Sequence, residues 1–193
     1  MIIKRTDIDF DKLIKCVEDN EFSLYLYKPT LTKPLLFDFE SMSLTRRVRY
    51  LLEYLRSEHY KVFYLSVRDE FVGFCVVTPG GRRLCYSSRD DIVLGPYYID
   101  ESKRGNGYSK ELIRLVIENY GRPYHYAYDW IHKDNLPSIK ASEACGFVRY
   151  GEIKIVGKLR RLVPVNGGGT SWVYQYKGLG RTHESTNNST SSR

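Results

Sequence analysis

The chain has 193 residues, of which 42% are hydrophobic and 27% are charged, and these proportions exclude a fibrous or wholly disordered chain and predict one globular domain. Its formal net charge of +7 favours anionic partners such as phosphates and nucleotides, but no run of five like charges occurs, so we do not expect a nucleic-acid partner. The four cysteines form no CxxC pair and no apolar run could span a bilayer, so we expect no metal site, no membrane partner and a cytoplasmic location.

The first sixty residues predict two amphipathic helices separated by an irregular segment. Residues 2–5 have the composition of a short strand, and Thr6 or Asp7 can cap a helix on which apolar residues recur at helical spacing, namely Phe10, Leu13, Ile14 and Val17. Prolines interrupt residues 21–44, which we predict to form a long ordered loop. The same helical spacing predicts a helix over Thr45–Tyr60.

The remaining elements are predicted from their alternation of β-rich runs and apolar stripes. They are a hairpin of strands Val62–Val67 and Phe71–Val77, a strand Asp91–Ile99, a helix Asn106–Tyr120, a strand Tyr124–His132, a short helix from Asp134 or Asn135 to Gly146, and strands Phe147–Val156 and Ser171–Tyr176. Residues 178–193 lack the apolar surface that would offset the entropy of ordering. We therefore predict a single domain over residues 1–177 and a disordered C-terminal tail over 178–193.

The segment Ile99–Ser109 lies between a predicted strand and a predicted helix and has the features of a phosphate-binding turn. The first backbone amides of a helix lack internal partners and lie at the positive end of the helix dipole, where an anion is stabilised. Gly105 and Gly107 would let phosphate oxygens approach the backbone, and Lys103 and Arg104 add positive charge. The third glycine of a dinucleotide-binding fingerprint and the Gly-Lys-Ser/Thr of a nucleoside-triphosphate loop are both missing. A purely structural turn stays open as the alternative.

Two stretches carry a resemblance to a known family. The order Arg104-x-x-Gly107-x-Ser109 resembles the pyrophosphate loop of the GNAT superfamily of acetyl-CoA-dependent N-acyltransferases, whose pattern is Gln/Arg-x-x-Gly-x-Gly/Ala. Ser109 departs from the usual final Gly or Ala but is small. Downstream, Asn135-Leu136-Pro137-Ser138-Ile139 followed by Gly146-Phe147 is similar to the family's second cofactor segment, and the resemblance covers roughly residues 2–176.

The resemblance implies a fold and a set of cofactor-binding residues. The implied fold is an α/β (α+β) one, the GNAT fold, with a mixed, mostly antiparallel central sheet that is splayed between strands 4 and 5 and flanked by helices. Acetyl-CoA is the implied acyl donor, with backbone groups of Tyr98 and Ile99 pairing with its pantetheine arm. The residues implied for the pyrophosphate are Arg104, Gly105, Asn106, Gly107, Tyr108 and Ser109, and those for the second segment are Asn135 and Ser138. Asn135 can alternatively serve only as a helix N-cap.

The implied reaction is direct attack of a neutral amine on the thioester, which needs a base and can use an acid. Many family members have a tyrosine as general acid seven residues after the asparagine, and this chain has Ser142 there. Asp129 and His132 are the candidate bases, with His125 further back, and the acid role is open to another residue, to water or to none.

The acceptor is not specified by the sequence. The aromatic segment Phe22–Phe39 predicts either a pocket wall or ordinary packing, and basic residues at 46, 47, 49, 158, 160 and 161 suit an anionic acceptor or a solvated face. We expect an N-acetyltransferase acting on a primary amine of a small molecule such as an amino sugar, or of a protein, as a monomer or homodimer. The alternative is a module that binds or senses acyl-CoA on the same fold with little catalysis.

Overall fold

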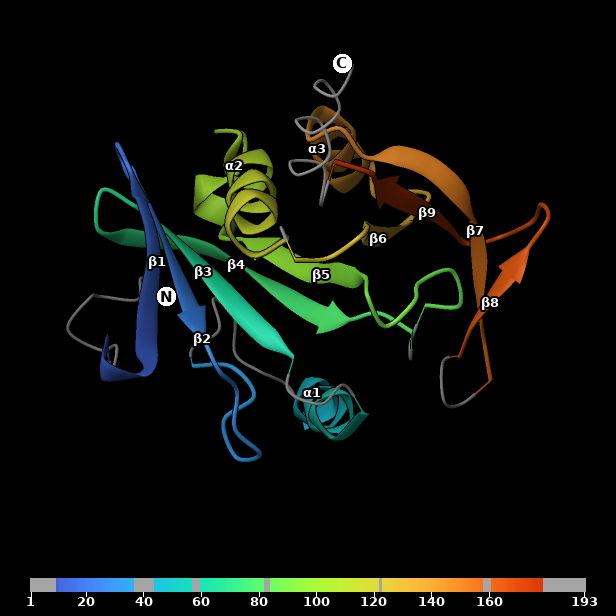
Figure 1. Cartoon of the computed structure of the whole chain (residues 1–193), viewed down its shortest axis with the longest axis horizontal. Helices are drawn as coiled ribbons and strands as arrows, with labels where there is room; N and C mark the ends of the chain where they lie inside the picture. The colour runs from blue at the N-terminus through green and yellow to red at the C-terminus, as the bar shows by residue number, and fades with distance from the viewer. Residues whose placement is uncertain are drawn as a thin grey trace, which may run out of the picture.

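A computed structural model describes residues 10–36, 44–56, 60–81, 84–121, 123–157 and 161–178 of the chain (Figure 1). The described elements, in chain order, are η2 (Phe10–Lys12), β1 (Leu13–Asp19), β2 (Phe22–Tyr27), α1 (Leu44–Arg56), β3 (Lys61–Val67), β4 (Glu70–Pro79), β5 (Ile92–Ile99), η3 (Glu101–Lys103), α2 (Tyr108–Val116), η4 (Ile117–Gly121), β6 (Ala127–His132), α3 (Leu136–Ala144), β7 (Val148–Val156), β8 (Arg161–Val165) and β9 (Ser171–Tyr176).

All the described strands belong to one nine-stranded sheet in the order β1-β2-β3-β4-β5-β6-β9-β7-β8. Every neighbouring pair is antiparallel except β5 and β6, which run parallel. Helices α2 and α3 cover one face and α1 lies against the other (Figure 1). The predicted mixed, mostly antiparallel sheet flanked by helices is therefore confirmed.

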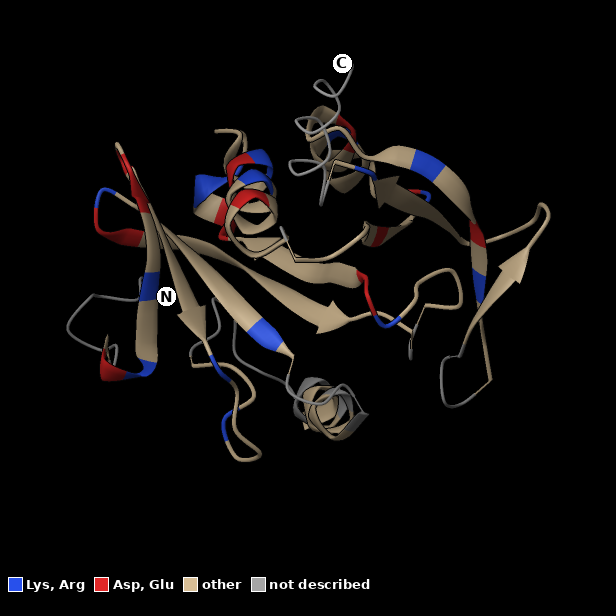
Figure 2. Cartoon of the chain, in the orientation of Figure 1, with Lys and Arg blue, Asp and Glu red and all other residues tan. Residues whose placement is uncertain are grey.

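The core has an apolar cluster on each face, because alternate side chains of a strand point to opposite sides. Leu65 and Leu94 of the sheet are buried together with Leu112 of α2, whereas Tyr60 and Tyr64 are buried on the face that carries α1. The central strands carry few charged residues, while α2 carries both signs on its outer side (Figure 2). The helices in the described ranges all fall short of the length and apolarity that a bilayer crossing demands.

The sheet divides where β5 and β6 separate. The two strands pair only through Ile92–Ala127, Val93–Tyr128 and Leu94–Asp129, after which β5 continues to Ile99 and β6 to His132. A β-bulge in the pairing of β4 with β5, between Cys75 and Val77, and a positive φ of 100° at Gly95 accompany the separation. These are the fourth and fifth strands of the sequence prediction, so the predicted splay is confirmed.

The prediction for the N-terminal part was wrong over the described residues. The expected helix through Leu13 and Val17 is instead strand β1, which forms a hairpin with β2 inside the predicted loop 21–44. The helical spacing of a few apolar residues cannot exclude a half-exposed edge strand, and pairing of β2 with β3 stabilises the extended form. The predicted strand over residues 2–5 lies outside the described residues, as does the predicted tail from residue 179 onward.

Candidate functional site

The turn between β5 and α2 is ordered by its own polar groups. The Asp100 carboxylate accepts hydrogen bonds from the backbone N–H of Ser102 at 2.9 Å and from its hydroxyl at 2.7 Å. Lys103 pairs with Glu70 on β4 at 2.7 Å, and Arg104 donates to the Ile99 carbonyl at 3.2 Å and pairs with Glu101 at 3.1 Å. The two cations are thus already partnered, so the backbone is the stronger candidate for binding an anion here.

Gly105 and Gly107 give this turn its shape. Both have positive φ, 86° and 78°, a region in which residues with a Cβ are strained. A Cβ built at either position meets no heavy atom within 4 Å, so the space in front of both glycines is open. Gly107 caps α2 without a side-chain hydrogen bond, which leaves the positive end of the α2 dipole facing that space. The predicted residues Asn106, Tyr108 and Ser109 complete the same turn, with Asn106 donating to the Lys103 carbonyl at 2.9 Å.

The predicted pantetheine residues lie on β5 beyond the point where it parts from β6. Tyr98 and Ile99 pair with Phe74 and Gly73 of β4, and the register with β6 ends at Leu94, four residues earlier. The Tyr98 ring stacks on Phe74 with the Arg104 guanidinium 5.2 Å above its centroid. The strand therefore offers a backbone edge toward the gap, while its far edge is fixed to the sheet.

Asn135 and Ser138 mark the start of α3 on the other side of the gap. The Asn135 side chain accepts a hydrogen bond from the Ser138 N–H at 3.4 Å, so the predicted N-cap role is present in the structure. The Ser138 carbonyl accepts a hydrogen bond from the Tyr97 hydroxyl at 3.2 Å. This contact joins α3 to β5 across the gap.

A buried polar cluster lies where the strands separate. Asp129 is 3% exposed and Ser142 is fully buried, and the Ser142 hydroxyl donates to Asp129 Oδ2 at 2.7 Å. The Tyr97 hydroxyl is 3.5 Å from Ser142 Oγ, and a Cβ at Gly95 would meet Asp129 Oδ1 at 3.7 Å and the Tyr97 ring at 4.0 Å. The structure thus brings together two of the three predicted catalytic residues, Asp129 and Ser142, and adds Tyr97.

Burial sets the protonation behaviour of this cluster. Removal from water raises the pKa of Asp129 to about 6, against the opposing effect of the hydrogen bond from Ser142. Burial and the neighbouring Asp129 charge raise the pKa of Tyr97 well above its usual value. A carboxyl group with a pKa near neutrality, next to a divided sheet, can exchange protons under physiological conditions.

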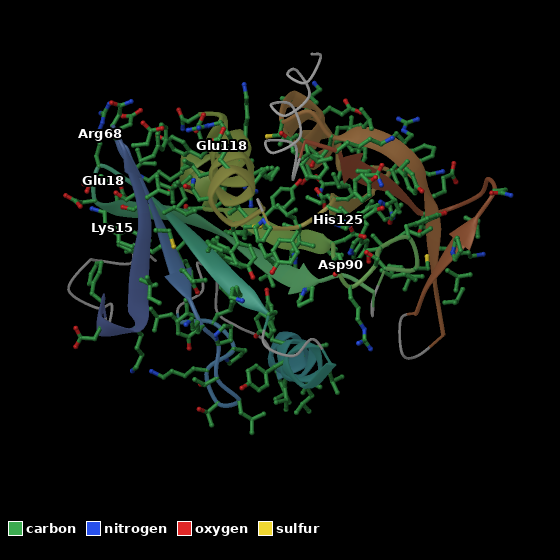
Figure 3. The ribbon with its side chains drawn as sticks, viewed as in Figure 1. Lys15, Glu18, Arg68, Asp90, Glu118 and His125 are labelled. Atoms are coloured by element: carbon green, nitrogen blue, oxygen red, sulfur yellow. The ribbon has the colours of Figure 1, made fainter. Side chains whose placement is uncertain are left out.

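The third predicted catalytic residue, His132, lies apart from this cluster. It is three residues beyond Asp129 on β6, so the two side chains point to opposite faces of the sheet. His132 is exposed, and its Nδ1 accepts a hydrogen bond from the Asp134 N–H at 3.3 Å. His125 is exposed before the start of β6, where its N–H donates to the Asp90 carbonyl, at the end of the strand away from the gap (Figure 3).

Sequence reasoning missed Tyr97. In a regular strand, residues three positions apart point to opposite faces of the sheet. Since Leu94 lies on the face covered by α2 and α3, regular alternation would place residue 97 on the other face. In the structure both Leu94 and Tyr97 contact the cluster beneath α2 and α3, because the irregular backbone at Gly95 changes the alternation by one residue. The signal available in the sequence was the Gly95-Pro96 pair inside a predicted strand, which is typical of a bulge.

The predicted acceptor features are described only in part. Tyr25 and Tyr27 of the aromatic segment are buried against Val62 and Phe71, which supports core packing for these two rings rather than a pocket wall. The side chains of Arg46, Arg47, Arg49 and Arg161, and residues Lys158 and Arg160, lie outside the described part of the chain. Within the described residues, no group of three or more His, Cys, Asp or Glu side chains could hold a metal ion.

Comparison with known proteins gives one family and a set of similar structures. The model of the acetyltransferase (GNAT) family matches residues 29–147. No curated protein sequence matches the chain.

Among solved structures, the chain is similar to the microcin C7 self-immunity acetyltransferase MccE in complex with acetyl-CoA and AMP, with 14% identity, a TM-score of 0.53 and coverage of 82% of this chain and 93% of that one. It is similar to the ribosomal-protein-S5-alanine acetyltransferase from Vibrio fischeri, with 16% identity, a TM-score of 0.52 and coverage of 83% and 95%. It is also similar to the ribosomal L7/L12 α-N-protein acetyltransferase RimL in complex with coenzyme A, with 16% identity, a TM-score of 0.55 and coverage of 85% and 98%. At these identities the likeness is one of fold.

The buried carboxyl of Asp129 is expected to make stability fall as the pH rises. Its pKa is raised from 3.8 to about 6, so the folded state binds this proton more tightly than the unfolded state. Below about pH 4 the Asp129 carboxyl is protonated in both the folded and the unfolded protein, so its ionisation does not reduce the stability of the fold. As the pH rises through about 6, folding has to bury a charge, which costs at most roughly 3 kcal/mol.

Asp129→Asn removes this charge and keeps an oxygen that accepts from Ser142. Its free energy of unfolding should therefore rise relative to that of the wild type between about pH 4 and about pH 7.5, by at most roughly 3 kcal/mol. Urea unfolding at the two pH values measures the difference, with the exposed Asp90→Asn as the matched control. A difference between Asp129→Asn and wild type that does not change with pH would contradict the buried charge.

Proposed function

This chain belongs to the GNAT acetyltransferase family, and from that premise we propose that it transfers the acetyl group of acetyl-CoA to a primary amine by direct attack. The observation that carries the proposal is the turn at Gly105 and Gly107, two glycines of positive φ that open onto free space at the N-terminus of α2. The Arg104 N–H already donates to the Glu101 carbonyl at 3.4 Å, so a diphosphate bound there would receive hydrogen bonds from the backbone amides of residues 105–109 and the favourable field of the helix dipole.

The gap between β5 and β6 suits the pantetheine arm. An extended chain of amides can pair with the free edge of a strand as an added strand does, and β5 has such an edge beyond Leu94, where Tyr98 and Ile99 lie. The Asp100 N–H donates to the Val72 carbonyl of β4, so by alternation the backbone groups of Tyr98 face β4 and those of Ile99 face the gap. Arg104 already donates to the Ile99 carbonyl, so we assign the pairing mainly to the Ile99 N–H. Asn135 and Ser138 at the N-terminus of α3 form the opposite wall of the proposed channel.

The proposed chemistry uses Asp129 as the base. A neutral amine attacks the thioester carbonyl while a backbone N–H of β5 polarises the oxygen. With a pKa of about 6, Asp129 is largely ionised at neutral pH and can accept the proton that the amine loses, directly or through a water molecule. Ser142 donates to Asp129 and so positions the carboxylate, and we do not assign its hydroxyl as the group that protonates the thiolate. His132 lies on the opposite face, and we give it no part in this step.

We further propose that residues 1–177 form one domain in the cytoplasm, with residues 178–193 as a tail outside it. The continuous sheet from Leu13 to Tyr176 supports the domain. The acceptor is proposed to be a primary amine of a small molecule such as an amino sugar, or of a protein, and the assembly a monomer or homodimer.

The proposed transfer should release free thiol from acetyl-CoA only when a suitable amine is present. The assay measures thiol release with a panel of amino sugars, peptides with free N-termini and lysine-containing peptides, with acetyl-CoA alone as the blank. Binding of CoA by calorimetry without thiol release across the panel would contradict transfer and favour the module that senses acyl-CoA. Absence of CoA binding would contradict both.

Gly107→Ala is expected to weaken CoA binding at least tenfold, because the Cβ projects into the space proposed for the diphosphate. Gly168→Ala is the matched control, since Gly168 also has a positive φ, 69°, and open space around its Cβ, but lies in the turn before β9. Both variants place a Cβ on a residue of positive φ, so both carry backbone strain of the same kind. Calorimetric titration with CoA measures the affinities, and equal affinities for the two variants would contradict the proposed diphosphate site.

Asp129→Asn is expected to lower kcat strongly, by about 100-fold or more, while the affinity for acetyl-CoA stays the same. The asparagine keeps the hydrogen bond with Ser142 but cannot accept the proton of the amine. Steady-state thiol release gives kcat, and calorimetry gives the affinity. An unchanged kcat would eliminate Asp129 as the base.

A further inference from the structure

Tyr97 joins the two sides of the divided sheet at the point where the chemistry is proposed to occur. Its ring extends from β5 toward α3, and its hydroxyl donates to the Ser138 carbonyl at 3.2 Å and lies 3.5 Å from Ser142 Oγ. Ser142 stands seven residues after Asn135, so the phenol oxygen lies beside the α3 position at which many family members carry a tyrosine. The hydroxyl group missing from α3 is therefore supplied from β5.

We propose that the Tyr97 hydroxyl donates the proton to the departing CoA thiolate and regains it from Asp129 through Ser142. This inference rests on the proposed function, because it requires the pantetheine sulfur to lie in the gap between β5 and β6. The contacts that carry it are the 2.7 Å hydrogen bond from Ser142 to Asp129 and the 3.5 Å contact of Ser142 with Tyr97. Together they form a continuous path of three oxygen-bearing side chains.

The proton balance of the step closes within this path. The amine nitrogen forms a bond to the carbonyl carbon, and the carbon–sulfur bond breaks with its electron pair on sulfur. Asp129 takes the proton that the amine loses, and Tyr97 gives its own proton to sulfur. Ser142 accepts the proton of Asp129 and passes its own to the Tyr97 oxygen, so all three residues return to their starting state.

The link to Asp129 is what makes the phenol an effective donor. Alone, Tyr97 is a poor acid, since burial and the Asp129 charge hold its pKa above the usual value. A thiol has an ordinary pKa of about 8.5, above the value of about 6 for Asp129, so net transfer from Asp129 to sulfur is downhill. Cys75 on β4 also faces Tyr97 and Asp129, but burial raises the pKa of its thiol and keeps it neutral. Ser138 and Ser142 are the partners from α3.

The role of Tyr97 as proton donor can be tested by titrating the thiol of bound CoA, which requires no knowledge of the acceptor. A phenol that donates to the sulfur stabilises the thiolate. The pKa of the thiol of bound CoA should therefore be about one pH unit higher in the Tyr97→Phe complex than in the wild-type complex. This pKa is measured from the ultraviolet absorbance of the thiolate as a function of pH, with the desulfo-CoA complex as the blank. Calorimetry with CoA shows that each complex has formed.

Tyr174→Phe is the matched control. Tyr174 is also a buried tyrosine, and its hydroxyl donates to Glu143 of α3 at 3.1 Å, but it is not part of the path from Asp129 through Ser142 to Tyr97. It should leave the pKa of the CoA thiol as in the wild type. An equal thiol pKa in wild type and Tyr97→Phe, with CoA bound to both, would overturn the role of Tyr97 and leave the acetyltransferase proposal standing. Failure of the wild type to bind CoA would overturn both.

Discussion

The site depends on the early end of pairing between β5 and β6. A parallel pair of strands gains stability from each successive backbone hydrogen bond, and here the register stops after Leu94 and Asp129 although both strands continue. Backbone groups that lose their ladder partners inside a protein are costly unless something else satisfies them. The irregular backbone at Gly95 and the bulge opposite Val76 let β5 turn away while it stays paired with β4 on both sides of the bulge, with the register shifted there by one residue.

The two sides of the gap are fixed by different parts of the fold. On one side β5 is paired with β4 and leads through Asp100 into the glycine turn and α2. On the other side β6 is paired with β9 and leads through Asn135 into α3. Because α2 and α3 contact each other above the sheet, the gap is bridged over its length by packing and by the hydrogen bond from Tyr97 to Ser138. These contacts hold the two sides of the gap in a fixed relation to each other.

The shape of the glycine turn could be predicted from the sequence, whereas the arrangement around Asp129 could not, for a physical reason. Glycines with positive φ before a helix are a local feature, so Gly105 and Gly107 can be recognised from the residues beside them. The pKa of Asp129 depends on burial beneath α3, which no local pattern reports. Tyr97 was missed because a change of one residue in strand alternation sends its ring to the other face.

The N-terminal hairpin of β1 and β2 also could not be predicted from local sequence patterns. Strand β1 has exposed and half-exposed side chains, so its apolar residues carry no strong period, and their chance helical spacing predicted a helix. This segment forms strands rather than a helix because β2 pairs with β3, a contact between segments about forty residues apart. Long-range pairing of this kind overrides weak local preference.

Ser142 and Asp129 depend on each other in a way that explains the departure from the family pattern. A carboxyl group that is 3% exposed needs a hydrogen-bond donor, and Ser142 supplies one at 2.7 Å. A tyrosine at position 142 would carry its hydroxyl several bonds further from the helix, past Asp129, and leave the carboxylate without that donor. Once Asp129 is buried at the division of the sheet, a short hydroxyl side chain on α3 is therefore favoured, and the phenol that we propose as the proton donor lies on the opposite strand. Tyr97 has that position, since its ring leaves β5 on the face that α3 covers.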